Sequence, residues 1–143
     1  MDDRDAITDV LARYGRALDD RDFAAVGRCF TVDARATFSG VEIAPGRDAI
    51  VAHLRGLAGL AASTHLFGLP VIELAADGTT ARVETAAVAH LVSAAPAGIV
   101  RTRGLRYRDV FVRSGTGGPW QIHQRVHRVD WMVEQPAVPP STR

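Results

Sequence analysis

The spacing of apolar residues changes once along this chain of 143 residues, and this change limits the fold more than any other feature. Between Asp5 and Asp20, apolar side chains recur every three or four residues, as on one face of an amphipathic helix. From Thr64 onwards, the chain is instead rich in β-branched and aromatic residues. Helices that precede a run of strands indicate an α+β domain, in which the helices pack against one face of a curved antiparallel sheet.

Capping and turn signals divide the chain into helices, strands and a tail. The expected helices cover residues 5–20, 23–30 and 48–60. The expected strands cover residues 34–38, 64–75, 80–94, 99–113 and 120–133, the last four joined as hairpins. A proline-rich tail at residues 134–143 is expected to fray, which leaves a single domain in residues 1–133.

Composition excludes several classes of protein. Because 17 basic residues nearly balance 16 acidic ones, nucleic acid is not an expected partner. No apolar run is long enough to cross a membrane and the acidic start lacks the pattern of a secretory signal, so we expect no membrane partner and a cytoplasmic location. All the basic residues are arginine, which excludes chemistry that depends on a lysine amine. Cys29, the one cysteine, is expected to be a buried structural thiol.

Two residues near the junction between helices and strands are the first candidates for chemistry. Asp19 lies at the C-terminal end of the first expected helix, where the helix dipole disfavours a carboxylate and a cationic partner is expected. Arg21 is one such partner, and His65 is another. Alternation places His65 on the same strand face as Phe67, so it is expected inside, as a packed core histidine or as a base. An aspartate bound to one ring nitrogen would leave the other free to take a proton.

Three residues on later strands are candidates for a second acid or base, or for polar groups of a pocket. His90 lies on an apolar strand face, where a packed histidine is the alternative. Asp109 and Tyr107 share an otherwise apolar face, on which an inward carboxylate needs a partner or a raised pKa. The alternative is that this face is the outer one and that Asp109 pairs with an arginine on a neighbouring strand.

Two further patterns bear on metal and anion binding. His123 and His127 are four residues apart, but four residues of strand span about 13 Å, too far for one zinc ion, so no metal site is expected. Arginines alternate with apolar residues from Arg101 to Arg113, which indicates a solvated strand face, a dimer rim or an anion-binding patch.

Six short segments, in order, resemble the nuclear transport factor 2-like superfamily, in particular its SnoaL-like and scytalone dehydratase-like branch. They are YGRALDDRD at residues 14–22, CFTVDA at 29–34, GRDAI at 46–50, STH at 63–65, YRD at 107–109 and WQI at 120–122. The resemblance covers most of residues 5–131. It implies a cone-shaped antiparallel sheet wrapped around about three N-terminal helices, with a small ligand between them.

The resemblance also implies a catalytic dyad. Scytalone dehydratase and the lindane dehydrochlorinase have a catalytic histidine at the position of His65 and an aspartate at the position of Asp19. This implies that His65 is the base, that Asp19 orients it, and that no cofactor is needed. His90 is similar in placement to a second pocket histidine of scytalone dehydratase. Two tyrosines that hold a water molecule in that enzyme correspond here to Leu18 and Phe38.

The expected function is a lyase, isomerase or cyclase that acts on a small apolar, aromatic or polyketide-like substrate. Related polyketide cyclases take their aspartate from a strand, a role that Asp109 could fill. The expected pocket residues are Tyr14, Phe38, Leu54, Phe67, Val88 and Trp131. A homodimer formed through the outer face of the sheet is expected. The alternatives are a non-catalytic binding or scaffold protein and the small subunit of a ring-hydroxylating oxygenase.

Overall fold

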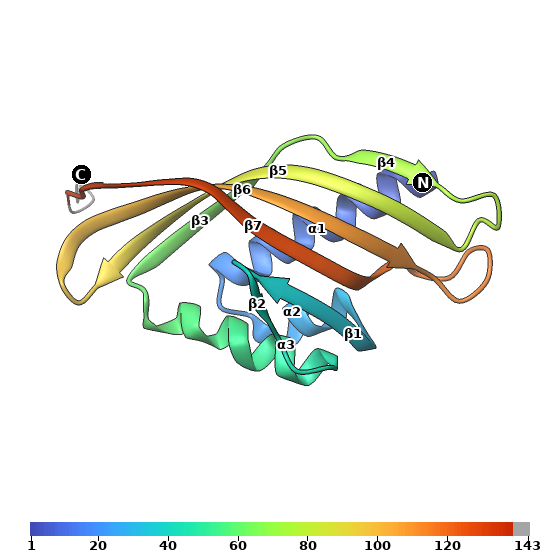
Figure 1. Cartoon of the computed structure of the whole chain (residues 1–143), viewed down its shortest axis with the longest axis horizontal. Helices are drawn as coiled ribbons and strands as arrows, with labels where there is room; N and C mark the ends of the chain where they lie inside the picture. Colours follow the sequence, from blue (N-terminus) through green and yellow to red (C-terminus); the bar gives the residue numbers. More distant parts are fainter. Residues whose placement is uncertain (139–143) are drawn as a thin grey trace.

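The computed structural model describes residues 1–138, which form helices on one face of a large, curved, open sheet (Figure 1). The helical elements are α1 (Asp3–Asp19), α2 (Phe23–Arg28), α3 (Arg47–Leu54) and a 3₁₀ turn, η1 (Arg55–Gly59). The strands are β1 (Phe30–Phe38), β2 (Val41–Glu42), β3 (Ala62–Phe67), β4 (Val71–Leu74), β5 (Thr80–Ala94), β6 (Ala97–Val112) and β7 (Gln121–Pro136). The α+β class expected from the sequence is confirmed.

Helix α1 forms where the three- and four-residue spacing predicts it. The side chain of Asp2 accepts a hydrogen bond from the backbone N–H of Asp5 at 2.8 Å and so caps the first turn. The apolar positions all face the sheet and are buried: Ile7, Val10, Leu11, Tyr14 and Leu18. Burial of such side chains, at about 1.5–3 kcal/mol each, stabilises the docked helix far more than helix propensity alone.

A glycine sets the distance between α1 and β3. A Cβ atom added at Gly15 would lie 2.7 Å from the ring of Phe67, which is too short for two carbon atoms. Any other residue at this position would therefore require the Phe67 ring to shift, whereas glycine lets the helix lie this close to the strand. As a result the C-terminal end of α1, with Asp19, lies beside β3, which carries His65.

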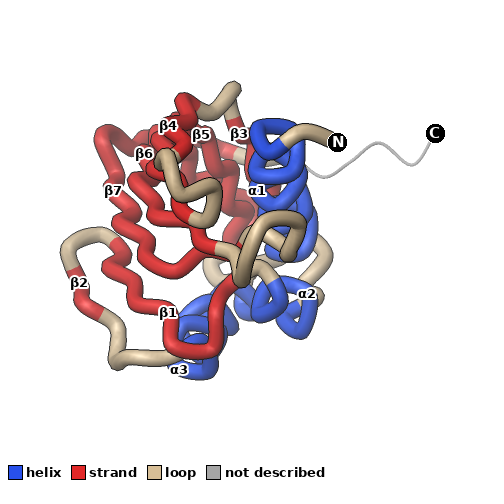
Figure 2. Tube along the Cα trace, turned by 90° about the vertical axis from the view of Figure 1, so that its right-hand side faces the viewer, coloured by secondary structure: helices blue, strands red, loops and turns tan. Residues whose placement is uncertain are grey.

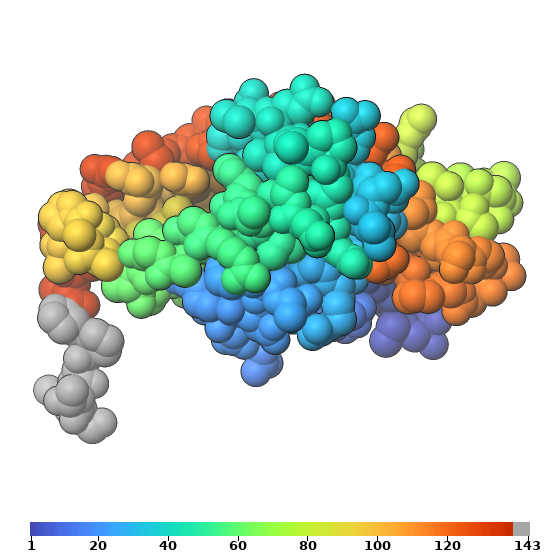
Figure 3. Space-filling view, turned by 90° about the horizontal axis from the view of Figure 1, so that it is seen from below, coloured from blue at the N-terminus to red at the C-terminus, as the bar shows by residue number. Residues whose placement is uncertain are grey.

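The sheet has the strand order β2-β1-β7-β6-β5-β3, and β4 pairs with β5 beyond the end of β3. Its long strands curve around the helices, as the view turned by 90° shows (Figure 2). Seen from below, the blue and green N-terminal elements cover the middle of the concave side, while the yellow and orange ends of the long strands extend beyond them (Figure 3). We call the side that faces the helices the inner face and the opposite side the outer face.

The expectation of a purely antiparallel sheet is wrong in one place. Strand β1 runs parallel to β7, with partners from Arg35 and Gln124 to Phe38 and His127, so the sheet is mixed. A pair of this kind cannot be joined by a hairpin, and β1 and β7 lie near opposite ends of the chain. The remaining strand pairs are antiparallel.

Three expected boundaries differ from the structure. Phe30, placed in the second helix, begins β1 instead, because it pairs with Ile122 on β7 and is fully buried there. The expected third helix becomes 3₁₀ after Leu54. The expected strand at residues 64–75 is two strands, β3 and β4, separated by residues that include Pro70, which has no N–H to donate to a ladder.

The expected frayed tail is only partly covered by the described residues. Strand β7 continues to Pro136, which pairs with Ile99 on β6, so the prediction is wrong for residues 134–136. Residues 139–143 lie outside the described part of the chain. None of the helices within residues 1–138 is long and apolar enough to cross a membrane.

Candidate active site

The chain turns sharply after α1, and this turn is bonded to both α1 and β3. Arg21 has a φ of 57°, in the left-handed region that costs a residue with a side chain roughly 1–2 kcal/mol. Its Nη1 donates to the carbonyl oxygen of Leu18 at 2.8 Å and to Oγ of Ser63 at 2.7 Å. A guanidinium at the C-terminal end of a helix is favourable because the last carbonyls carry partial negative charge.

Asp19 and His65 are in direct contact. Nδ1 of His65 lies 2.7 Å from Oδ1 of Asp19, and Oδ2 accepts the backbone N–H of His65 at 2.8 Å. Oδ1 also accepts the hydroxyl proton of Ser63 at 2.9 Å. These donors stabilise a carboxylate that the end of α1 would otherwise disfavour. Arg21, the alternative partner, reaches the carboxylate only through Ser63.

This bonding pattern selects one form of the His65 ring. An ionised carboxylate can only accept hydrogen bonds, so the proton between the two side chains belongs to Nδ1, and Nε2 of the neutral ring is free. The His65 side chain is 6% exposed and that of Asp19 is 22% exposed, so water competes little for the contact. Such a pair can accept a proton at Nε2, and the carboxylate stabilises the imidazolium that results.

A cavity of about 300 Å³ lies between the inner face of the sheet and the helices, and His65 lines it. This volume is at the lower end of the range for sites that bind small molecules. Besides His65, four of the residues expected to form the site also line it: Tyr14, Phe38, Leu54 and Tyr107. Leu18 and Phe38, which stand where the resemblance implies two tyrosines, form part of its apolar wall.

His127 also lines the cavity, although the sequence analysis treated it only as half of a metal pair. Its ring lies 5.3 Å from that of Phe38 and 5.2 Å from that of Tyr107. Burial, with the nearby charges of Arg125 and Arg103, lowers the pKa of His127 to about 4. The imidazole is therefore neutral at pH 7. Its Nδ1 is buried and has no hydrogen-bond partner within residues 1–138.

Arg103 is a second polar residue of the cavity that the sequence analysis did not assign to the site. It lies within the alternating arginines from Arg101 to Arg113, but on the inner face, in register with Ala89 of β5. Its Nε is buried and, in the described part of the chain, has no hydrogen-bond partner. Burial lowers the pKa of Arg103.

Asp109 lies beneath the cavity and not in its lining. Its carboxylate forms a two-fold contact with Arg125 on β7, at 2.8 Å to Nε and 2.7 Å to Nη2, and both side chains are fully buried. The guanidinium stacks on Tyr14 and Tyr107, at 4.4 Å and 4.3 Å from the ring centres. Burial raises the pKa of Asp109, which Arg125 partly offsets. Asp109 thus faces inward and also pairs with an arginine from the neighbouring strand.

Four other expected site residues do not line the cavity. His90 and Val88 lie on the outer face, because the alternate residues Ala87 and Ala89 are the buried ones. His90 is bonded there to Oγ1 of Thr102, at 2.9 Å from its Nδ1. Trp131 is 51% exposed and lies across Gly104 on the outer face. Phe67 is on the inner face, where it packs on Tyr14 and Tyr107 behind the cavity wall.

The last candidates are the possible metal ligands and the cysteine. Within residues 1–138, no group of three or more His, Cys, Asp or Glu side chains could hold a metal ion. His123 points away from His127, with its Nδ1 at 2.9 Å from Oγ1 of Thr31. Cys29 is buried, as expected, and burial raises the pKa of its thiol.

Comparison with known proteins agrees with this fold. The model of the SnoaL-like domain family matches residues 1–126. No curated protein matches the sequence.

Three solved structures show how widely the fold is shared. A single-residue variant of Rv3472 from Mycobacterium tuberculosis, a protein of unknown function, is 28% identical over 87% of this chain and 74% of that one, with a TM-score of 0.74. Hexachlorocyclohexane dehydrochlorinase LinA-type3 from Novosphingobium barchaimii LL02 is 15% identical over 96% and 94% of the two chains, with a TM-score of 0.83. ActVI-ORFA from Streptomyces coelicolor is 23% identical over 87% and 95%, with a TM-score of 0.72. With its family model matched over residues 1–126 and its helices enclosed by a curved, open sheet, the chain belongs to the SnoaL-like domain family.

Proposed function

We propose that this chain is an enzyme that moves a proton on a small, largely apolar substrate, in an elimination, dehydration, isomerisation or cyclisation. His65 is the base, and Asp19 orients its ring and stabilises its charged form. A His–Asp pair supplies this base without a cofactor. The observation that carries the proposal is the 2.7 Å contact between the two side chains at the wall of a mostly apolar cavity.

Two features of the surroundings favour a base over a packed histidine. Asp19 is held by three donors and Ser63 is held in turn by Arg21, so the carboxylate cannot turn away when the ring changes charge. Nε2 of His65 has no hydrogen-bond partner in residues 1–138, and His65 lines a cavity, which leaves this nitrogen available to a ligand. The fold is also shared with a hexachlorocyclohexane dehydrochlorinase, which makes elimination the first reaction to test.

The experiment compares purified variants in two assays. Chloride release from hexachlorocyclohexane tests elimination, and the absorbance of conjugated products from cyclic β-hydroxy ketones tests dehydration. Turnover of any substrate found should fall by at least about 100-fold in His65→Ala, since a positioned general base contributes about 10²–10⁴-fold. Asp19→Asn should fall by a similar factor, because the amide cannot stabilise the imidazolium.

His90→Ala is the matched control, because it removes a histidine from the outer face of the same sheet. It should keep wild-type turnover. Full turnover in either His65→Ala or Asp19→Asn, with the fold intact by circular dichroism, would refute the role given to the pair. Binding without turnover of any compound in these classes would favour a non-catalytic binding protein instead.

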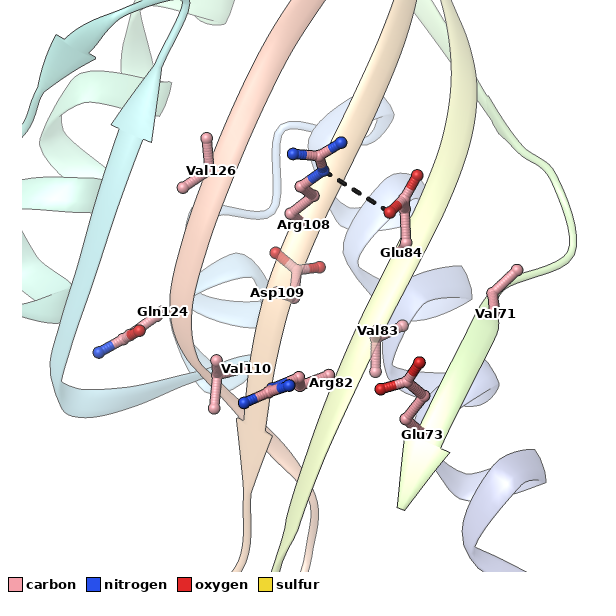
Figure 4. A pocket seen from close by; sticks show the side chains of 10 residues that line it. All are labelled: Val71, Glu73, Arg82, Val83, Glu84, Arg108, Asp109, Val110, Gln124 and Val126. Carbon is pink, nitrogen blue, oxygen red and sulfur yellow. Dashed lines mark ion pairs between the residues drawn. The ribbon is translucent and has the colours of Figure 1, made fainter. Parts of the chain in front are cut away.

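We also propose that the protein forms a homodimer through the outer face. A groove of about 380 Å³ crosses this face over β4 to β7, with the helices behind the sheet (Figure 4). It is lined by Val71 and Val126, both exposed, and by charges of both signs. Arg108 lies 3.6 Å from Glu84. A two-fold axis places the same patch on both subunits, and a patch with both signs can complement itself.

A further inference from the structure

The inner face places His65 and Arg103 in one row across three strands. Strand register pairs His65 with Ala89 on β5, and pairs Ala89 with Arg103 on β6. Neighbouring strands are about 4.8 Å apart, so the backbones at the two ends of the row are about 10 Å apart. Because alanine is the residue between them, a ligand in the cavity can lie over Ala89 and reach both side chains.

Arg103 differs from two neighbouring arginines of β6 in having no acidic partner within the described residues. Arg101 is bonded to Glu134 at 2.6 Å and Arg106 to Glu84 at 2.7 Å, whereas Arg103 forms no ion pair in residues 1–138. Nε of Arg103, like that of Arg106, is buried without a hydrogen-bond partner there. This Nε is also out of contact with solvent. A ligand anion in the cavity would therefore meet the outer nitrogens of the guanidinium, and it would supply the counter-charge that the described residues do not.

The acidic groups nearest the cavity, among the described residues, are already used by other partners. Asp109 is neutralised by Arg125 beneath the cavity floor, and the carboxylate of Asp19 is used by His65 and Ser63. His127 is the second lining residue with a buried polar atom, Nδ1, that has no partner in residues 1–138. Arg103 and His127 thus form a polar corner in a mostly apolar cavity wall.

We propose that Arg103, with His127 beside it, binds a carboxylate of the substrate. The substrate class is then small carboxylic acids with an apolar body that lies over Ala89, so that the C–H bond near the other end meets His65. This inference rests on the proposed function for the place of the reacting atoms, but the carboxylate site itself does not depend on turnover. Arg103 is thus a specificity residue, and the base remains His65.

The test is binding of matched ligands that differ only in charge. Acetate, benzoate and 2-naphthoate are titrated against the corresponding amides by isothermal calorimetry. In the wild-type protein at least one carboxylate should bind at least tenfold more tightly than its amide. Arg103→Met should remove this preference, Arg103→Lys should retain part of it, and Arg108→Met on the outer face should leave it unchanged. In ¹⁵N spectra, the Nε–H signal that Arg103→Met removes should shift when the carboxylate is added to wild-type protein.

The outcomes separate this proposal from the one it rests on. His65→Ala should keep the preference for the carboxylate even where turnover is lost. Equal affinity for acid and amide across all three pairs, or no binding of any of them, would overturn the carboxylate site. A preference that persists in folded Arg103→Met would do the same, because another group would then hold the anion.

Discussion

Removing the charge of Asp109 should destabilise the protein severely, although the residue does not touch the cavity. Asn is nearly the same size as Asp, so Asp109→Asn leaves the packing in place. It leaves the guanidinium of Arg125, which is fully buried, without a counter-charge. Breaking a buried ion pair in this way costs about 3–5 kcal/mol. The stacking of Arg125 on Tyr14 and Tyr107 is present in both proteins and does not reduce the difference.

A loss of this size is a large part of the stability of a domain, which is about 5–15 kcal/mol. For a chain near this length, each kcal/mol lowers the melting temperature by roughly 2–4 °C, so a fall of about 10 °C is expected. Urea unfolding at one fixed protein concentration, followed by tryptophan fluorescence, measures the free energy of unfolding directly.

Two further variants make the measurement decisive. Glu84→Gln removes a carboxylate from a partly exposed pair with Arg106 and should cost much less than Asp109→Asn, because water and salt screen exposed ion pairs. The double change Asp109→Leu with Arg125→Met replaces both charges by apolar groups and should recover most of the loss. If Asp109→Asn costs no more than Glu84→Gln, the buried pair stabilises the fold no more than an exposed pair does.

Two other outcomes follow from the structure. The pKa of His127 is about 4 in the folded protein, below its ordinary value of 6.5, so the unfolded chain binds the extra proton first as the pH falls. The contribution of His127 to the free energy of unfolding is constant above about pH 6.5 and declines by about 3 kcal/mol towards pH 4. Urea unfolding between pH 4.5 and 7 should therefore show a smaller loss of stability in His127→Phe than in the wild type. Parallel plots of stability against pH for the two proteins would contradict the low pKa of His127. If the outer face forms the homodimer, Val126→Asp should halve the mass found by sedimentation velocity. Val32 is an exposed valine on β1, outside the groove, and Val32→Asp should leave the mass unchanged. A wild-type protein that sediments as a monomer would exclude the dimer.

Local periodicity was enough to predict the order of most elements, whereas the pairing of Asp19 with His65 was implied by the family resemblance. The buried residues of α1 follow the helical spacing, and Ser63, His65 and Phe67 alternate onto the inner face of β3. These features depend on residues close together in sequence, which a pattern can report. The role of the pair in catalysis stays a prediction.

Alternation failed on β5 because the smaller residues are the inner ones. The inner face there carries Ala87 and Ala89, whereas bulkier Val88 and His90 face outward, so apolar size indicated the wrong side. Ala89, one of these small inner residues, lines the cavity. A sequence pattern that equates large apolar residues with the interior cannot find a cavity of this kind.

A bulge explains the error at Trp131. Between β6 and β7 the register shifts near Leu105, where Gly104 pairs with Trp131 but Leu105 pairs with Val129. Two residues of β7 then match one of β6, and Trp131 moves to the outer face. A second shift near Phe111 lets Ile122 share the inner face with Arg125 and His127. Such shifts are set by pairing across strands, which local alternation does not encode.

The parallel pairing of β1 with β7 determines when this protein can complete its fold during synthesis. Strand β1 ends at Phe38, but its partner begins at Gln121, so the segment that carries β1, β2 and α3 has no sheet to join until the last strand has left the ribosome. Chains are made at about 5–20 residues per second, so β1 stays unpaired with β7, and the apolar side of this segment stays exposed, for several seconds. Loss of the last strand would therefore leave the wall of the cavity that contains Phe38 and Leu54 without support, even though both residues lie in the first half of the chain.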